Sequence, residues 1–256
     1  MKIAVSGKGG VGKTTFSAVL ARLLSSLGKK VFAIDADPDA NLASAVGVPG
    51  EKKIVPLAEM RGLIRERTEA GPGGYGVFFK LNPTVSDIPD KFYTEHGGVK
   101  VLVLGAVQIG GGGCACPENV FLKALLNHLV LQRDEVVIVD MEAGIEHFGR
   151  GVETSIDAVL AVVEPSLESI GLAAKIHELA TQAGAQFAGA VLNKVQSPAV
   201  ERRLRDELEA RQLRVLGLVH YHQALADAGL AGLSLTEMDS MEDVVHLVDA
   251  LGTFES

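Results

Sequence analysis

The chain has 256 residues, and its hydrophobic content of 47% is enough for a buried core, which excludes an intrinsically disordered protein. The 24 basic and 32 acidic residues give a formal net charge of −8, which argues against nonspecific nucleic-acid binding through a basic surface. No apolar run approaches the length of a membrane span, and the N-terminus begins a predicted strand instead of a signal peptide, so we expect a cytoplasmic protein without a membrane partner.

The first predicted strand, residues 2–5, is followed by a glycine-rich loop and by a predicted helix near residues 14–28. The loop fits the pattern G-x-x-x-x-G-K-[ST], in which backbone N–H groups surround the phosphates of a nucleotide. In such a loop Lys13 reaches the β- and γ-phosphates, and the Thr14 hydroxyl binds Mg²⁺. The pattern therefore predicts an ATP site. Its expected nucleotide-binding residues are Gly9, Gly10, Val11, Gly12, Lys13, Thr14 and Thr15.

Lys8 is a second lysine in this loop, whereas an ordinary phosphate-binding loop needs only Lys13. Lys8 lies too early in the loop to share the position of Lys13, so we expect its charge to act on phosphates held by a second subunit. This hypothesis makes the protein a homodimeric ATPase in which each chain contributes to the site of the other. Both lysines are then expected to be catalytic residues.

Short apolar runs alternate with amphipathic stretches along the rest of the chain. Strands are predicted at residues 31–35, 101–105, 136–140, 158–163, 189–193 and 215–219, and helices near residues 118–132, 167–183, 199–212 and 240–251. The alternation implies an α/β fold with a mostly parallel, doubly wound sheet flanked by helices on both faces. We expect a single domain over residues 1–256. Residues 49–98, which contain a short apolar run at 77–80, are predicted to be an irregular insertion, with a hairpin as one option. The insertion either docks a partner or only covers the surface.

Several predicted strands end in polar residues, at the sheet edge where parallel sheets bind ligands. The second predicted strand ends in Asp35, which is followed by Asp37, and a carboxylate there can orient the attacking water and sense the state of the nucleotide. Asp140 ends a later strand, in the position of an acid that faces Mg²⁺, often through water. Gly144 gives a backbone that can move to the γ-phosphate as a switch. We expect Asp37 to be catalytic and to form the switch together with Asp35 and Gly144.

Asn193 and Lys194 follow a further predicted strand. The amide of Asn193 offers a donor and an acceptor to the edge of adenine, so we expect both residues to bind nucleotide. The last predicted strand is followed by His220, Tyr221 and His222, which we interpret as ordinary strand-end residues and not as metal ligands.

The two cysteines, Cys114 and Cys116, form a C-x-C pair after a run of four glycines. Two thiolates are fewer than the four ligands that a structural zinc site or an iron–sulfur cluster usually takes. A symmetric dimer with this loop on its axis would supply four, so we favour a metal shared between two subunits over a pair of unmetallated thiols. Thiolates bind Zn²⁺ tetrahedrally and Ni²⁺ in a square plane, and the pattern does not separate the two metals.

Taken together, these motifs resemble the deviant Walker A ATPases, a group that includes the MinD and ParA proteins and the nitrogenase iron protein. The resemblance is carried by the loop with Lys8, by Asp35-x-Asp37-Pro38, by Asp140 to Gly144 and by Asn193-Lys194. Within the group, residues 78–83, 88–92, 114–119 and 140–147 look most like the CooC type, the nickel-insertion ATPases of carbon monoxide dehydrogenase. The similarity extends from the first predicted strand to the last predicted helix.

The resemblance implies a homodimer that binds ATP and Mg²⁺, with Zn²⁺ or Ni²⁺ held between the subunits by Cys114 and Cys116. ATP binding would be coupled to dimer closure and to nickel delivery into the metal cluster of the client, carbon monoxide dehydrogenase. Lys8 would reach the nucleotide of the partner, and Asp37 would help to position the lytic water. Residues 220–222 depart from the proline-containing turn that the resemblance leads us to expect after the last strand.

Two alternatives remain open at the level of sequence. One is an electron-transfer or cluster-carrier ATPase with an iron–sulfur cluster between its subunits, although the nitrogenase iron protein takes its cysteines from two separate loops and this chain has both in one. The other is a partitioning ATPase of the ParA or MinD kind. The acidic composition and the absence of a basic amphipathic face at residues 238–246 oppose it, so we expect no nucleic-acid or membrane partner.

Overall fold

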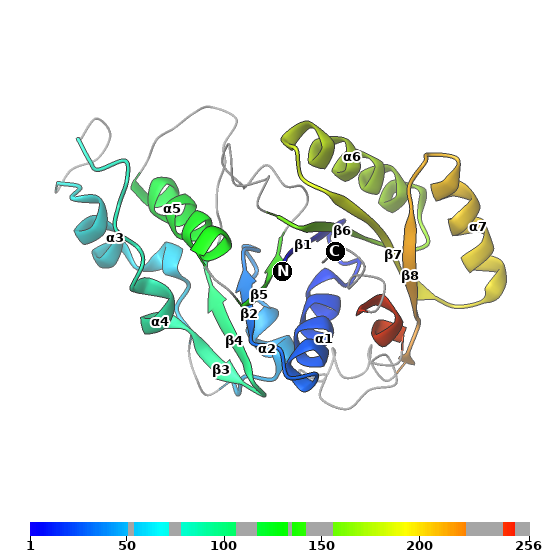
Figure 1. Ribbon diagram of the computed structural model, residues 1–256, viewed down its shortest axis with the longest axis horizontal. Coiled ribbons are helices and arrows are strands. Elements are labelled where there is room, and N and C mark those ends of the chain that lie inside the picture. The colour runs from blue at the N-terminus through cyan, green and yellow to red at the C-terminus, as the bar shows by residue number, and fades with distance from the viewer. Residues whose placement is uncertain are drawn as a thin grey trace.

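The computed structural model of the protein describes residues 1–50, 54–71, 78–105, 117–132, 135–141, 156–223 and 243–248. Within these residues the strands form one eight-stranded sheet, in the spatial order β3-β4-β2-β5-β1-β6-β7-β8 (Figure 1). Neighbouring strands are parallel except for β3 and β4. The strands are β1 (Lys2–Gly7), β2 (Val31–Asp35), β3 (Thr94–His96), β4 (Val99–Val103), β5 (Val136–Asp140), β6 (Ala158–Val163), β7 (Phe187–Val195) and β8 (Val215–His220).

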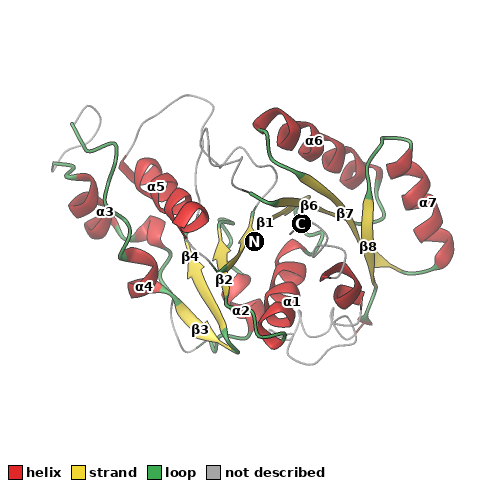
Figure 2. Cartoon of the chain, in the orientation of Figure 1, coloured by secondary structure: helices red, strands yellow, loops and turns green. Residues whose placement is uncertain are grey.

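Helices cover both faces of this sheet (Figure 2). One face packs against α1, α2 and the helical residues 243–248, and the other packs against α3 to α7 and the 3-10 helix η1. No helix in the described part of the chain is long and apolar enough to cross a membrane. The bounds are α1 (Lys13–Ser26), α2 (Leu42–Val46), η1 (Leu57–Glu59), α3 (Arg61–Thr68), α4 (Ile88–Phe92), α5 (Pro117–Gln132), α6 (Leu167–Ala183) and α7 (Pro198–Glu209).

The central strand β1 shows how the sequence builds two apolar layers. Successive side chains of a strand point to opposite faces, so Ile3 and Val5 pack on the α1 side while Ala4 packs on the other. Because both faces are covered, the buried strands read as continuous apolar runs instead of alternating patterns. The predicted mostly parallel, doubly wound α/β sheet is therefore confirmed.

The predicted insertion is more regular than the sequence indicated. The described part of residues 49–98 contains η1, α3, α4 and β3. An antiparallel hairpin is present, but it pairs β3 with β4 around the turn Gly97-Gly98, and Phe78 to Lys80 are not in a strand. The helices are short and α3 buries only Ile64 and Thr68, so the apolar pattern was too sparse to reveal them.

Candidate nucleotide site

The glycine-rich loop connects β1, at the centre of the sheet, to α1. Gly12 precedes the helix with φ 96° and ψ 25°, and no side chain caps the helix N-terminus. The first N–H groups of α1 have no carbonyl partner within the helix, and the helix dipole adds positive potential at the same place. The loop thus presents backbone donors to an anion, as a phosphate-binding loop does.

Lys13 is the first residue of α1, and its side chain is largely buried. Its ammonium donates to the backbone carbonyl of Lys8 at 3.3 Å, so the charge lies inside the loop. A buried ammonium inside a glycine-rich loop is placed to bind phosphate oxygens.

Asp140 lies at the carboxyl end of β5 and is fully buried. One carboxylate oxygen, Oδ1, accepts the Ser17 hydroxyl at 3.1 Å, and the Thr14 hydroxyl lies close to this carboxylate. The other oxygen, Oδ2, is buried without a hydrogen-bond partner among the described residues. Burial raises the pKa of Asp140 to about 6.

The unpaired oxygen of Asp140 makes this position a good fit for a divalent cation. Buried acceptors are almost always satisfied, and Mg²⁺ prefers carboxylate and hydroxyl oxygens together with phosphate and water. Thr14 and Asp140 supply such oxygens next to the phosphate-binding loop. Their arrangement therefore suits the magnesium role that the sequence predicted for both.

Asp35 ends β2 directly beside Asp140, its register partner on β5. Its carboxylate accepts the backbone N–H groups of Asp37 at 3.2 Å and Leu42 at 2.8 Å, so it organises the turn that leads into α2. Burial raises the pKa of Asp35 to about 7. Asp37 is half-buried, and its Oδ1 accepts the N–H of Asp39. Asp35 thus supports the segment that carries Asp37, and the switch and catalytic roles of the two stay predictions.

Lys8 turns away from the loop interior and toward the start of α6. Its ammonium lies 2.6 Å from Glu168 Oε2 and 3.9 Å from Glu164 Oε1. The hydrogen bond to Glu168 raises the pKa of Lys8 and lowers that of Glu168. Within one chain Lys8 is therefore held by α6, and its expected contact with the nucleotide of a partner stays a prediction.

Asn193 and Lys194 connect β7 to the phosphate-binding loop. The strand is irregular there, and Lys194 adopts φ 58°. The Asn193 amide donates to the carbonyl of Val11 at 2.8 Å, and the Lys194 ammonium donates to the carbonyl of Gly10 at 2.7 Å. The ammonium of Lys194 also lies 3.0 Å from Glu164. Both residues therefore lie at the site, and they fix the loop from outside.

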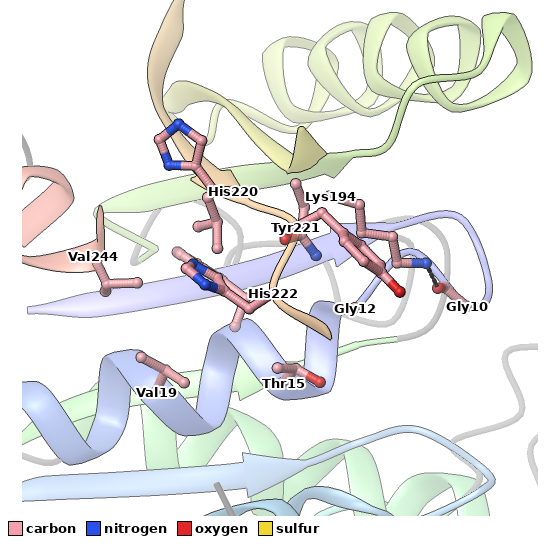
Figure 3. A pocket seen from close by; sticks show the side chains of 12 residues that line it. Gly10, Gly12, Thr15, Val19, Lys194, His220, Tyr221, His222 and Val244 are labelled. Carbon is pink, nitrogen blue, oxygen red and sulfur yellow. Dashed lines mark hydrogen bonds between the residues drawn. The ribbon is translucent and has the colours of Figure 1, made fainter. Parts of the chain in front are cut away.

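A cavity of about 210 Å³ opens beside the loop, between α1, β7, β8 and residues 243–248 (Figure 3). The loop end supplies backbone and polar groups, while the far end is apolar and aromatic, as expected for a nucleotide with its base at the far end. No sequence motif indicated this far end. Its residues are Phe16, Val19, Val219, His220, Tyr221, His222 and Val244.

Residues 220–222 lie at a strand end, as interpreted from the sequence, but their place beside the loop was not predicted. They follow β8, whose carboxyl end lies at the same sheet edge as the loop, and they line the cavity. The rule that ligands bind at the carboxyl ends of parallel strands could have identified them. Of the other predicted site residues, Cys114, Cys116 and Gly144 lie outside the described residues.

The family model described as "CobQ/CobB/MinD/ParA nucleotide binding domain" matches residues 2–235. The chain belongs to this family. Among its relatives, the carbon monoxide dehydrogenase accessory protein CooC of Rhodospirillum rubrum is 46% identical over 98% of this chain and 95% of its own length. An uncharacterised ATP-binding protein of Methanocaldococcus jannaschii is also 46% identical, over 91% of this chain and 90% of its own length.

Solved structures of the MinD branch of the family share the fold. The septum site-determining protein MinD of Pyrococcus horikoshii, solved with Mg-ADP, aligns with a TM-score of 0.66 at 20% identity and covers 100% of this chain and 99% of its own. The MinC–MinD complex of Aquifex aeolicus gives 0.69 at 20% identity, covering 98% of this chain and 95% of its own. This CobQ/CobB/MinD/ParA family member is thus a P-loop ATPase of MinD-like fold, and the resemblance identified from the sequence is confirmed.

Proposed function

We propose that the protein is a homodimeric ATPase that assists nickel insertion into carbon monoxide dehydrogenase. The observation that carries the proposal is the 46% identity to the accessory protein CooC over 98% of the chain. A relationship of that extent covers the phosphate-binding loop, the strand-end acids and the cysteine pair together. Each of these parts has a role in the proposed cycle.

Nucleotide binding rests on the loop and on Asp140. Lys13 and the N–H groups at the start of α1 bind the phosphates of ATP, and Thr14 and Asp140 hold Mg²⁺. When bound, Mg²⁺ neutralises charge that develops on the phosphate oxygens. Asp37 orients the attacking water, and Asp35 keeps the segment of Asp37 in place through the hydrogen bonds to its N–H and to that of Leu42.

Lys8 makes hydrolysis depend on the dimer. In one chain its ammonium is paired with Glu168. In the proposed dimer it leaves this acid for the phosphates of the partner's nucleotide, where a second positive charge stabilises the transition state. ATP thereby favours the closed dimer, because Lys8 can leave Glu168 for phosphates only when the partner chain carries ATP.

The cargo is bound by the C-x-C pair. Cys114 and Cys116 of two chains supply four thiolates for one Ni²⁺ or Zn²⁺, and nickel passes from there to the client enzyme. Because ATP and metal both favour one closed dimer in this scheme, each must tighten the binding of the other.

The proposal is tested by light scattering and metal analysis on anaerobically purified protein, with and without ATP and one equivalent of Ni²⁺. We expect ATP or Ni²⁺ to produce a dimer with one metal per two chains. In the double variant Cys114→Ser/Cys116→Ser the metal should be lost while ATP affinity is retained, and Lys13→Ala should retain the metal but lose ATP.

Delivery is measured by incubating nickel-deficient carbon monoxide dehydrogenase with the protein, ATP and Ni²⁺, and by following the recovery of CO oxidation. The double cysteine variant serves as the matched control, because its nucleotide site is unchanged. Four irons per dimer with visible absorption would instead favour an electron-transfer or cluster-carrier ATPase. An ATP-dependent dimer without metal would favour a partitioning ATPase.

A further inference from the structure

The helical residues 243–248 form part of the wall of the nucleotide cavity. Val244 is buried and lines the cavity, and Leu247 is buried against β8. The contact with β8 is close, since a Cβ on Gly217 would lie only 2.7 Å from Leu247 Cδ2. Figure 3 shows the ring of His222 between Val244 and Tyr221, above Val19 of α1. A helix far along the chain from the phosphate-binding loop thus meets the same cavity.

Asp243, the first of these helical residues, is tied to the end of β8. Its carboxylate accepts the backbone N–H of His220 at 2.9 Å and lies 3.1 and 3.2 Å from Nδ1 of the same residue. It also lies 3.5 Å from Nε2 of His222. One carboxylate therefore binds His220 and lies near the imidazole of His222, on the other side of Tyr221.

The cluster of His220, His222 and Asp243 does not form a metal-ligand set within the described part of the chain. Among the described residues, no three histidine, cysteine, aspartate or glutamate side chains are arranged to hold a metal ion. Asp243 fixes the end of β8 through its hydrogen bonds to His220, and His222, two residues further on, lines the cavity.

We propose that Asp243 is a positioning residue of the nucleotide site, which holds His222 and Val244 as the wall against which the base of ATP binds. The proposal rests on ATP binding in this cavity. Nε2 of His222 is buried and forms no hydrogen bond within the described residues. Because an unpaired buried nitrogen is costly, a small inward movement of Asp243 on base binding would be favoured by completing this contact. Base binding and docking of residues 243–248 thereby support each other.

The location of Asp243 gives a specific expectation. Its described polar contacts are to His220 and His222 and none is to the phosphate-binding loop. Loss of the carboxylate should therefore weaken binding of the base and leave binding of the phosphates unchanged. ATP and ADP should lose affinity by the same factor, whereas inorganic tripolyphosphate, which has no base, should lose none.

The test is the variant Asp243→Asn, with Kd measured by calorimetry for ATP, ADP and tripolyphosphate, and with KM and kcat for ATP. The loss of one charge-assisted contact predicts that Kd for both nucleotides and KM rise about tenfold. We expect kcat and the Kd of tripolyphosphate to stay within twofold, and Asp243→Glu to restore part of the affinity. Asp206→Asn is the control, because Asp206 is exposed on α7 and the chemical change is identical.

The variant His222→Gln provides a second line of evidence, with His246→Gln as its control on an exposed position of residues 243–248. His222→Gln should reproduce the selective loss of nucleotide affinity. If Asp243→Asn does not fold, the result for His222→Gln alone tests the proposal. Hydrogen exchange at residues 243–248 should slow with ATP but not with tripolyphosphate.

Equal losses for ATP and tripolyphosphate, or unchanged nucleotide affinity in both variants, would overturn the proposal. Failure of the wild-type protein to bind ATP at all would instead contradict the nucleotide site itself, so the two failures are distinguishable.

Discussion

Replacing single glycines of the phosphate-binding loop by alanine should separate backbone strain from steric overlap. At Gly9 a Cβ would meet nothing within 4 Å, and the same is true at Gly10, which has φ 75°. At Gly12, with φ 96°, a Cβ would lie 2.4 Å from Nδ2 of Asn193, the atom that donates to the Val11 carbonyl. The three positions thus form a graded series within one loop.

The expected losses of unfolding free energy follow from these differences. Gly9→Ala should change it by less than about 0.5 kcal/mol, because neither φ nor packing opposes the methyl group. Gly10→Ala should cost about 1–2 kcal/mol, the usual cost of a left-handed conformation for a residue with a Cβ. Gly12→Ala carries the same strain and also displaces Asn193, whose lost hydrogen bond adds about 1 kcal/mol, so about 2–3 kcal/mol in all.

Urea unfolding followed by circular dichroism measures the series, with Gly9→Ala as the control for loss of a glycine in the loop. An Asn193→Ala variant tests the second contribution, because Gly12→Ala should cost less in that background than in the wild type. If Gly10→Ala and Gly12→Ala were equally destabilising, the contact between the loop and Asn193 would be wrong.

The remaining predictions concern the charged residues of the site. Lys13→Ala should abolish ATP binding in a calorimetric titration, and normal turnover in this variant would contradict the phosphate-binding assignment. The variant Lys8→Ala should bind ATP but should neither dimerise nor hydrolyse ATP. The variant Glu168→Gln should dimerise at a lower ATP concentration than the wild type, because the loss of the acid releases Lys8. Light scattering over a series of ATP concentrations measures both variants, and equal midpoints for Glu168→Gln and the wild type would refute the release of Lys8. Burial raises the pKa of Asp35 to about 7 and of Asp140 to about 6 from 3.8, so the folded state binds more protons than the unfolded state between about pH 4 and pH 7. The contribution of these two groups to stability is therefore present at low pH and is lost as pH rises through 6 and 7. Asp35→Asn should flatten the dependence of the unfolding free energy on pH in this range. An unchanged slope in this variant would contradict the raised pKa of Asp35.

The parts of the site that were predictable from the sequence are those set by local spacing. The positions of Lys13 and Thr14 were predictable because the eight-residue motif fixes the spacing between its glycines, the lysine and the hydroxyl residue. Asp140 was predictable because a buried parallel strand is a continuous apolar run and its last residue is at the ligand-binding edge. The fold followed from the same alternation of strands and helices.

The parts that were not predictable depend on contacts between distant segments. The ion pair of Lys8 with Glu168 joins residues 160 positions apart, and no pattern in either segment indicates the other. The link from Asp243 to His220 is shorter in sequence, but the two lie on different elements whose docking is a packing result. The short helices of the insertion were missed because local propensity is weak and their burial depends on α5 and the sheet.

The position of β1 at the centre of the sheet has a consequence for synthesis on the ribosome. The strand that carries the phosphate-binding loop is made before both of its neighbours, because β5 and β6 begin only at Val136 and Ala158. At a translation rate of about 5–20 residues per second, β1 waits on the order of ten seconds for a partner. Until β5 has been made, the chain carries the complete loop motif while β1 has no strand partner in the sheet. ATP can therefore stabilise this fold only late in synthesis, once β5 and β6 have joined the strand that carries the loop.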